Sequence, residues 1–181
     1  MIKSPNIEPF DDVDRRILQE LQTDGRLTSV ELARRIGLST SATHSRIRQL
    51  EQEGFVDRYV ALLNWERAGY DMVCFVNVSL QMHQPERVEA VRTAIQEMPE
   101  VLECYHVTGE FDYLLKVAIR NRKDLERFIL HRLTPIPGVS RIYTSLVLNV
   151  VKATTALPIG ESTDRCEGWQ PHVLPTELAA G

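Results

Sequence analysis

Apolar residues in the first third of the chain recur every three to four positions, in three short runs separated by turn residues. This spacing is typical of an amphipathic helix that buries one face. Each run opens on a residue whose side chain can cap a helix, namely Asp11, Thr28 or Ser39. The pattern predicts helices over residues 11–23, 28–36 and 39–53.

The second and third predicted helices are joined by a tight turn. Thr28 and Glu31 have the spacing of a capping box, which marks a helix start. Gly37 ends the second helix, because glycine enters the left-handed backbone region without steric penalty. Two helices joined in this way predict a helix-turn-helix, whose second helix enters the DNA major groove. Short strands are expected next, over residues 55–56 and 59–63, as a wing or an exit ribbon.

From residue 72 onward, strand-like runs alternate with helical ones. Strands are predicted over residues 72–82, 101–108, 111–119 and 139–152, with helices from Pro85 and over residues 121–133. This order, strand-helix-strand-strand-helix-strand, is the ferredoxin-like plan. The fold class is therefore α+β. The expected parts are a flexible arm (1–10), a winged helix-turn-helix domain (11–63), a hinge (64–71), a ferredoxin-like domain (72–155) and a polar tail (156–181).

The third predicted helix has an exposed face that suits DNA. Thr43, Ile47 and Leu50 fall on one side at helical spacing and are expected in the core. The opposite side and its flanks carry hydroxyl, imidazole, amide and guanidinium groups, which pair with base edges and phosphates. A face that only meets solvent more often carries Glu and Lys, and that plain amphipathic helix is the alternative. The candidate DNA contacts are Ser41, His44, Ser45, Arg48 and Gln49, with Arg34 and Arg35 at the end of the second helix, and Arg46, for which a structural salt bridge is an equal alternative.

Positive charge is local rather than general in this chain. The 181 residues carry a formal net charge of −4, which argues against a basic coat for nucleic acid. Residues 29–49 nevertheless hold four Arg against one Glu. A local patch of this kind fits specific docking on phosphates.

Motifs for catalysis, metals and membranes are scarce. Cys74, Cys104 and Cys166 lie far apart, so neither a zinc site nor a disulfide framework is expected, and reduced thiols fit a cytoplasmic location. The N-terminal residues do not resemble a signal peptide, and no apolar run approaches the ~20 residues of a membrane helix. Cys104 and His106 share a predicted strand face without a third orienting group. We expect a protein that is not an enzyme and holds no metal or cofactor.

The predicted turn at residues 109–112 has the chemistry to hold an amino acid. Gly109 permits a sharp turn whose free N–H groups can take a carboxylate. Asp112 can meet an ammonium group. The alternative is a plain hairpin turn in which Asp112 caps Gly109 or Phe111, or pairs with a surface Lys.

Four stretches in order give the chain a resemblance to the Lrp/AsnC (leucine-responsive, or feast/famine) family of transcriptional regulators, over roughly residues 11–155. They are DVDRRILQELQTDGRLTSVELARRIGLS, RIRQLEQEGFVDRYVALLN, CYHVTGEFDYLLKV and LTPIPGVSRIYTSLVLNVVK. The resemblance implies a winged helix-turn-helix followed by a ligand-sensing ferredoxin-like domain that dimerises and often builds octamers. It also implies that an amino acid, bound between sensing domains of neighbouring dimers, shifts the assembly or its affinity for double-stranded DNA.

The resemblance also names effector-binding positions. Residues Gly109, Glu110, Phe111 and Asp112 match the family's effector loop, Thr144, Ser145, Leu146 and Val147 match the opposite wall, and Arg122 falls near the matching pocket. We therefore expect a sequence-specific DNA-binding regulator that responds to an amino acid. The alternative is a DNA-organising protein that needs no effector.

Overall fold

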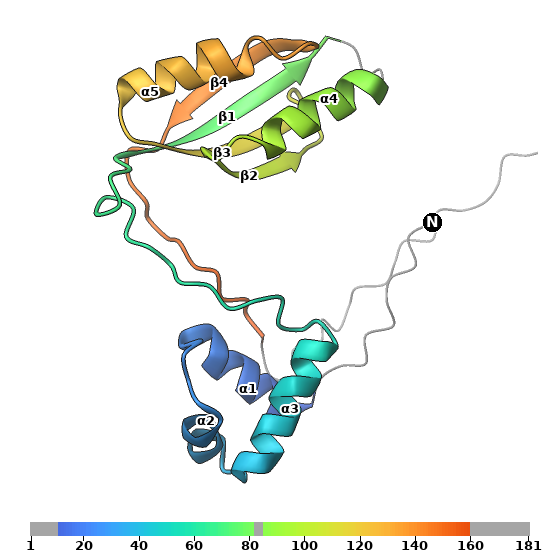
Figure 1. Cartoon of the computed structure of the whole chain (residues 1–181), viewed down its shortest axis with the longest axis vertical. Coiled ribbons are helices and arrows are strands. Elements are labelled where there is room, and N and C mark those ends of the chain that lie inside the picture. Colours follow the sequence, from blue (N-terminus) through green and yellow to red (C-terminus); the bar gives the residue numbers. More distant parts are fainter. Residues whose placement is uncertain (1–10, 82–84, 160–181) are drawn as a thin grey trace, which may run out of the picture. The chain divides into compact units, whose positions relative to one another are not determined.

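The computed structural model describes residues 11–81 and 85–159, which form two compact units (Figure 1). The first unit takes its described residues from 1–61 and 154–181, and the second from 62–153. Each unit has its own hydrophobic core. The arm predicted at residues 1–10 and the tail from residue 160 lie outside the described residues.

The first unit contains the three predicted helices, α1 (Asp12–Thr23), α2 (Ser29–Ile36) and α3 (Thr40–Gln52). Their N-caps are those read from the sequence: the side chains of Asp11, Thr28 and Ser39 accept bonds from backbone N–H groups of the first turn. Gly37 ends α2 with a φ of 78°, in the left-handed region. Local capping therefore sets where each helix begins and ends.

The core of the first unit is built from one stripe of each helix. Ile17, Leu32 and Leu50 are buried there. Thr43 of α3 is also fully buried, and its hydroxyl donates to the Ser39 carbonyl at 3.0 Å. Because that bond satisfies its one donor, a polar residue can occupy the core at this position.

The short strands predicted after α3 do not form. Within the described chain, no strand lies between α3 and residue 72. Phe55 and Val56 instead donate their backbone N–H groups to the Leu50 carbonyl, at 2.9 and 3.4 Å, which closes the end of α3. A strand needs a neighbour to satisfy its ladder, and these residues pair with no strand among the residues that the structure describes.

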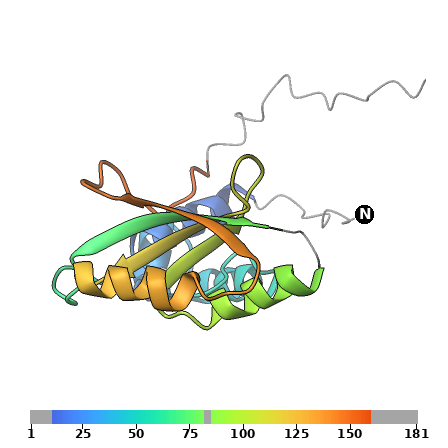
Figure 2. The ribbon, with the colours of Figure 1, turned by 90° about the horizontal axis from the view of Figure 1, so that it is seen from above.

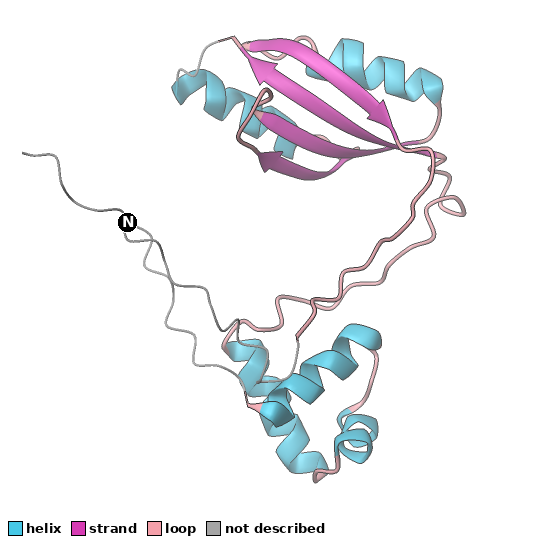
Figure 3. Ribbon diagram, turned by 180° about the vertical axis from the view of Figure 1, so that it is seen from behind, coloured by secondary structure: helices cyan, strands magenta, loops and turns pink. Residues whose placement is uncertain are grey.

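The second unit has the predicted strand-helix order. Its elements are β1 (Met72–Leu80), α4 (Pro85–Gln96), β2 (Val101–His106), β3 (Tyr113–Ile119), α5 (Arg122–Arg127) continued by a π-helical segment η1 (Phe128–Leu133), and β4 (Val139–Leu146). The sheet is antiparallel, in the order β2-β3-β1-β4. Both helices lie on one face of it (Figure 2 and Figure 3). The ferredoxin-like prediction is thereby confirmed.

The last strand is shorter than predicted. β4 ends at Leu146 instead of continuing to residue 152. The Val147 N–H still donates to the Val73 carbonyl at 2.9 Å, but the chain before β1 folds into turns that include a bond from Tyr70 to Trp65. Residues 148–152 therefore pair with no strand among the described residues, although their apolar composition favours strand formation.

The sheet buries one face and leaves the other open. Alternate residues of the central strands, together with Phe128 and Leu133, form the core under the helices. The side chains on the opposite face include large apolar ones. Phe75, Tyr105 and Tyr143 remain 37%, 50% and 59% exposed there.

The separate cores predict separate unfolding transitions. Leu115→Ala, at a fully buried position of the second core, should lower that unit's free energy of unfolding by about 2–5 kcal/mol, because it leaves a cavity. Leu32→Ala should do the same to the first unit. Differential scanning calorimetry checks this: each change is expected to move a different transition. One common transition that moves with both variants would show a single cooperative unit.

Candidate nucleic-acid interface and effector loop

α3 exposes one polar face beside its buried stripe. Thr43 and Leu50 are buried and Ile47 packs against the same core, as the helical spacing predicted. Ser41, Ser45 and Arg48 are exposed on the other side, and His44 and Gln49 are exposed as well. The core fixes the rotation of α3 about its axis, and this rotation presents the hydroxyl and guanidinium groups to the outside.

Arg46 belongs to the scaffold of this unit. Its Nη1 donates to Asp11 Oδ2 and to Asp14 Oδ1, both at 2.7 Å, and so joins α3 to the start of α1. The hydrogen bond from the Asp14 backbone N–H, and then Arg46, lower the pKa of Asp11 against the opposing effect of burial. Of the two roles considered for Arg46, the structure supports the structural salt bridge.

Two other candidate DNA contacts bind to side chains of the same unit. Arg35 pairs with Glu20 of α1 at 2.6 Å, and Gln49 donates to Glu53 at 2.8 Å. Both pairs lie at the surface, where such interactions contribute little to stability. Arg34 is exposed at the end of α2.

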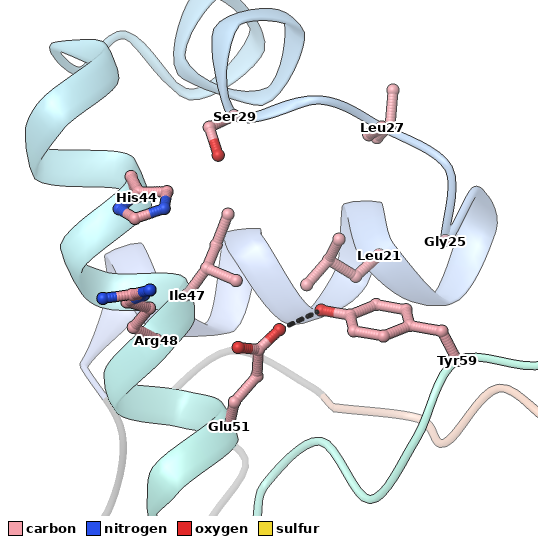
Figure 4. Close-up of a pocket in the computed structure, with 9 residues that line it drawn as sticks. All are labelled: Leu21, Gly25, Leu27, Ser29, His44, Ile47, Arg48, Glu51 and Tyr59. Atoms are coloured by element: carbon pink, nitrogen blue, oxygen red, sulfur yellow. Dashed lines mark hydrogen bonds between the residues drawn. The ribbon is translucent and has the colours of Figure 1, made fainter.

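A hollow of about 250 Å³ flanks the polar face of α3 (Figure 4). His44 and Arg48 of α3 stand on one side of it, and Ser29 at the start of α2 stands across from them. Its wall also contains Leu21, Gly25, Leu27, Ile47, Glu51 and Tyr59. Ser29 was not among the sequence candidates, although its place directly after the Thr28 cap was a usable signal.

Tyr59 was also missed by sequence reasoning. Its hydroxyl donates to Glu51 at 3.0 Å, and burial, followed by this bond, raises the pKa of Tyr59 to about 12. A Cβ added at Gly25 would stand 3.4 Å from the Tyr59 ring, so the ring closely approaches the turn after α1. Tyr59 thus fixes the segment after α3 to the edge of the hollow.

The predicted effector loop lies against β4. Gly109 has a φ of 125°, a backbone conformation that glycine adopts without strain. Glu110 pairs with Arg141 of β4 at 2.6 Å. The Arg141 guanidinium also lies over the Phe111 ring at 5.0 Å, and the Phe111 and Tyr143 ring centroids are 6.3 Å apart. A salt bridge and aromatic contacts therefore hold this loop in place.

Asp112 joins the loop to the end of β1. Its carboxylate accepts from the Leu80 N–H at 2.7 Å, and its own N–H donates to the Val78 carbonyl at 3.0 Å. The sequence had suggested either an ammonium partner or a cap within the turn. The bond to Leu80 is a third arrangement, which positions the loop relative to the sheet.

The predicted wall at residues 144–147 begins near the effector loop and runs away from it along β4. The loop contacts Val78 and Leu80, whereas Thr144 pairs with Val76 and Leu146 with Cys74. The separation along β1 is two to four residues for Thr144 and four to six residues for Leu146, which is about 14–20 Å for the latter at about 3.4 Å per residue. Arg122 follows β3, whose last residue pairs with Met72, so it lies toward the Leu146 end. One chain therefore does not bring the complete predicted set together.

The Cys104–His106 pair lacks the features of an activated nucleophile. Burial raises the pKa of the Cys104 thiol, which disfavours the reactive thiolate. The His106 ring stacks on Tyr113 with a centroid separation of 5.1 Å. Across residues 11–81 and 85–159, no group of three or more His, Cys, Asp or Glu residues is placed to hold a metal ion. In that same part of the chain, every helix is too short or too polar to cross a membrane.

Comparison with known proteins gives matches over both units. The winged helix-turn-helix DNA-binding model matches residues 10–57, and the Lrp/AsnC ligand binding domain model matches residues 73–157. The leucine-responsive regulatory protein of Escherichia coli K12 is 39% identical over 150 residues, covering 83% of this chain and 92% of that protein.

Solved structures match over the same span. A Neisseria meningitidis transcriptional regulator in complex with L-Met has a TM-score of 0.80 and 39% identity, covering 83% of this chain and 97% of that one. An AsnC family regulator from Agrobacterium tumefaciens has a TM-score of 0.78 and 32% identity, covering 82% and 97% of the two chains.

The salt bridge of Arg46 predicts a pH-dependent loss of stability. Arg46→Ala should lower the free energy of unfolding of the first unit by about 1 kcal/mol at pH 7, since these groups are only partly buried. The lowered pKa of Asp11 means that its contribution is present above the pKa of the unfolded chain and disappears as the pH falls through the folded value. Urea unfolding should thus show a lower free energy of unfolding for the variant than for the unmodified protein at pH 7, and this difference should vanish in acid. An equal difference at both pH values would contradict this assignment.

Proposed function

Because the chain belongs to the Lrp/AsnC family of transcriptional regulators, we propose that it reads specific DNA sites through the exposed face of α3, under the control of an amino acid bound by the second unit. The observation that carries this proposal is that the residues of α3 fall into separate groups, some packed within the first unit and others exposed. Thr43 and Leu50 are buried in the core and Arg46 forms the salt bridges to α1, whereas Ser41, Ser45 and Arg48 are exposed. The Ser41 hydroxyl lies 3.3 Å from the hydroxyl of the Ser39 cap.

DNA contacts on this face divide into two kinds. Arg48 can reach a guanine edge or a phosphate, and the short hydroxyls of Ser41 and Ser45 let the helix approach base edges closely. His44 and Ser29 line the hollow beside Arg48 and are suited to backbone phosphates. The few cations here bind one site weakly, so a single first unit is a poor DNA-binding protein by itself.

A second copy of the chain supplies the missing affinity. The open face of the sheet carries Phe75, Tyr105 and Tyr143, and the Lys116–Glu103 salt bridge at 2.8 Å neutralises the charges among them. An apolar face of this kind is typical of a subunit interface. A two-fold dimer through this face presents two copies of α3 to two half-sites. Further association of dimers into an octamer extends the same arrangement.

The effector is proposed to bind where loop 109–112 of one chain approaches strand residues 144–147 of another. Within one chain the far part of this wall, where Leu146 pairs with Cys74, lies four to six strand residues from Val78 and Leu80, which supports a site that a second chain completes. The related regulator from Neisseria meningitidis was solved with L-Met, and the Escherichia coli relative is a leucine-responsive protein. An effector that binds one assembly better than another shifts the population and hence the spacing of the recognition helices.

Arg48→Ala tests the DNA-binding face. Loss of one base or phosphate contact should weaken binding to a selected operator by about 5- to 150-fold, while the fold survives because Arg48 is exposed. Fluorescence anisotropy at fixed salt measures the affinity, with Arg92→Ala on α4 as a control that removes the same charge from the other unit. Binding that is unchanged in Arg48→Ala, or equally weakened in Arg92→Ala, would refute the assignment.

Phe75→Glu tests the open sheet face. A charge at this position would have to be buried without a partner in the dimer, so we expect monomers at concentrations where the unmodified protein is dimeric. Light scattering after size-exclusion chromatography measures the mass. Leu130→Glu is the matched control, because Leu130 is an exposed apolar residue of the helical layer. A Phe75→Glu protein that stays dimeric would place the interface elsewhere.

A further inference from the structure

Residues 154–159 follow the second unit in the chain but lie against α1 of the first unit. Gln22 of α1 bonds both backbone groups of Leu157 in this segment. Its Nε2 donates to the Leu157 carbonyl at 3.2 Å, and its Oε1 accepts from the Leu157 N–H at 2.5 Å. The contact is therefore directional and uses both halves of the glutamine amide.

A second glutamine extends the same contact. Gln19, one turn earlier on α1, donates to the Ile159 carbonyl at 2.9 Å. Residues three apart on a helix share one face, so Gln19 and Gln22 present their amides together. The Ile159 side chain is half-buried and packs against the core of the first unit. Two polar clamps and one apolar anchor thus dock this segment, which we call the C-terminal strap (residues 154–159).

The strap reaches the DNA-binding face through α1. The opening of α1 carries Asp11 and Asp14, which hold Arg46 of α3, and Glu20 of α1 holds Arg35 of α2. The strap itself begins eight residues after the end of β4. Between them Leu148 and Val151 are each 92% exposed, so the docking begins only at the glutamine clamps.

We propose that the C-terminal strap is a second tether for the DNA-binding unit, and that Gln19 and Gln22 are positioning residues for DNA binding. The chain leaves this unit after residue 61 and returns to it at residue 154, so two segments connect it to the second unit. Docking the strap shortens the free length of the return path. A shorter tether raises the effective concentration of the second recognition helix at its half-site once the first is bound.

This inference rests on the proposed function, namely that paired copies of α3 bind paired half-sites. It adds that docking of the strap joins the segment that follows β4 to α1. It also distinguishes the affinity for one half-site from the gain in affinity on a full site. A contact that only stabilises the fold would change both quantities together. Releasing the strap should reduce the gain from binding two half-sites and leave the affinity for one half-site intact.

The test compares two duplexes, a full site selected from random DNA and its isolated half. Gln19→Ala/Gln22→Ala should bind the half-site within about twofold of the unmodified protein and lose at least about fivefold on the full site. Gln96→Ala, an exposed glutamine of α4, is the matched control and should bind both duplexes normally. Amide hydrogen exchange at Leu157 reports release of the clamp.

A second variant keeps the clamps and adds slack. A flexible Gly-Ser insertion of about six residues between Val151 and Lys152 should reproduce the loss on the full site. An unchanged ratio of full-site to half-site affinity in both variants would overturn the inference, as would an equal loss on both duplexes, which would mark the strap as a stabiliser only. If the unmodified protein binds neither duplex, the proposed function itself fails.

Discussion

The contact between α1 and α3 is the constraint on which the DNA-binding unit depends. Arg46 joins the middle of α3 to both carboxylates at the start of α1, and the buried side of α3 packs beside this bridge. With the rotation of α3 fixed in this way, the residues left outside are short, polar or cationic. The same α1 holds the C-terminal strap on another part of its surface. One helix therefore receives the connection from the second unit and supports the surface proposed to read DNA.

The register of the sheet imposes a comparable constraint on ligand binding. Asp112 ties the loop at residues 109–112 to the Leu80 end of β1, and pairing with β4 places Leu146 opposite Cys74. The near end of the candidate wall thus lies close to the loop, and its far end lies four to six strand residues away along β1. If neighbouring chains complete the site, as we propose, binding of an amino acid is coupled to assembly. The open apolar face of the same sheet is the surface that we propose for the first step of that assembly.

Local features of the sequence predicted most of the fold, because caps and hydrophobic periodicity act over a few residues. The helix starts at Asp11, Thr28 and Ser39 are examples. The errors arose where the outcome depends on distant partners. Residues 55–63 and 148–152 have strand-like composition but form no strand in the part of the chain that the structure describes. For Arg46 the sequence left two roles open, because the carboxylates of its salt bridge lie 32 and 35 residues away. The roles of Ser29 and Tyr59, and the bond from the Leu80 N–H to the Asp112 carboxylate, likewise become visible only when separate segments are brought together.

The measurement that tests this account most directly is DNA binding by the intact protein in the presence of each of the standard amino acids. A selected operator duplex is titrated at fixed salt, first without addition and then with each amino acid, beginning with L-methionine and L-leucine. The account predicts that at least one of them changes the apparent affinity for the operator by about fivefold or more. Specific binding with the same affinity under all conditions would contradict it, and would indicate a DNA-organising protein that needs no effector.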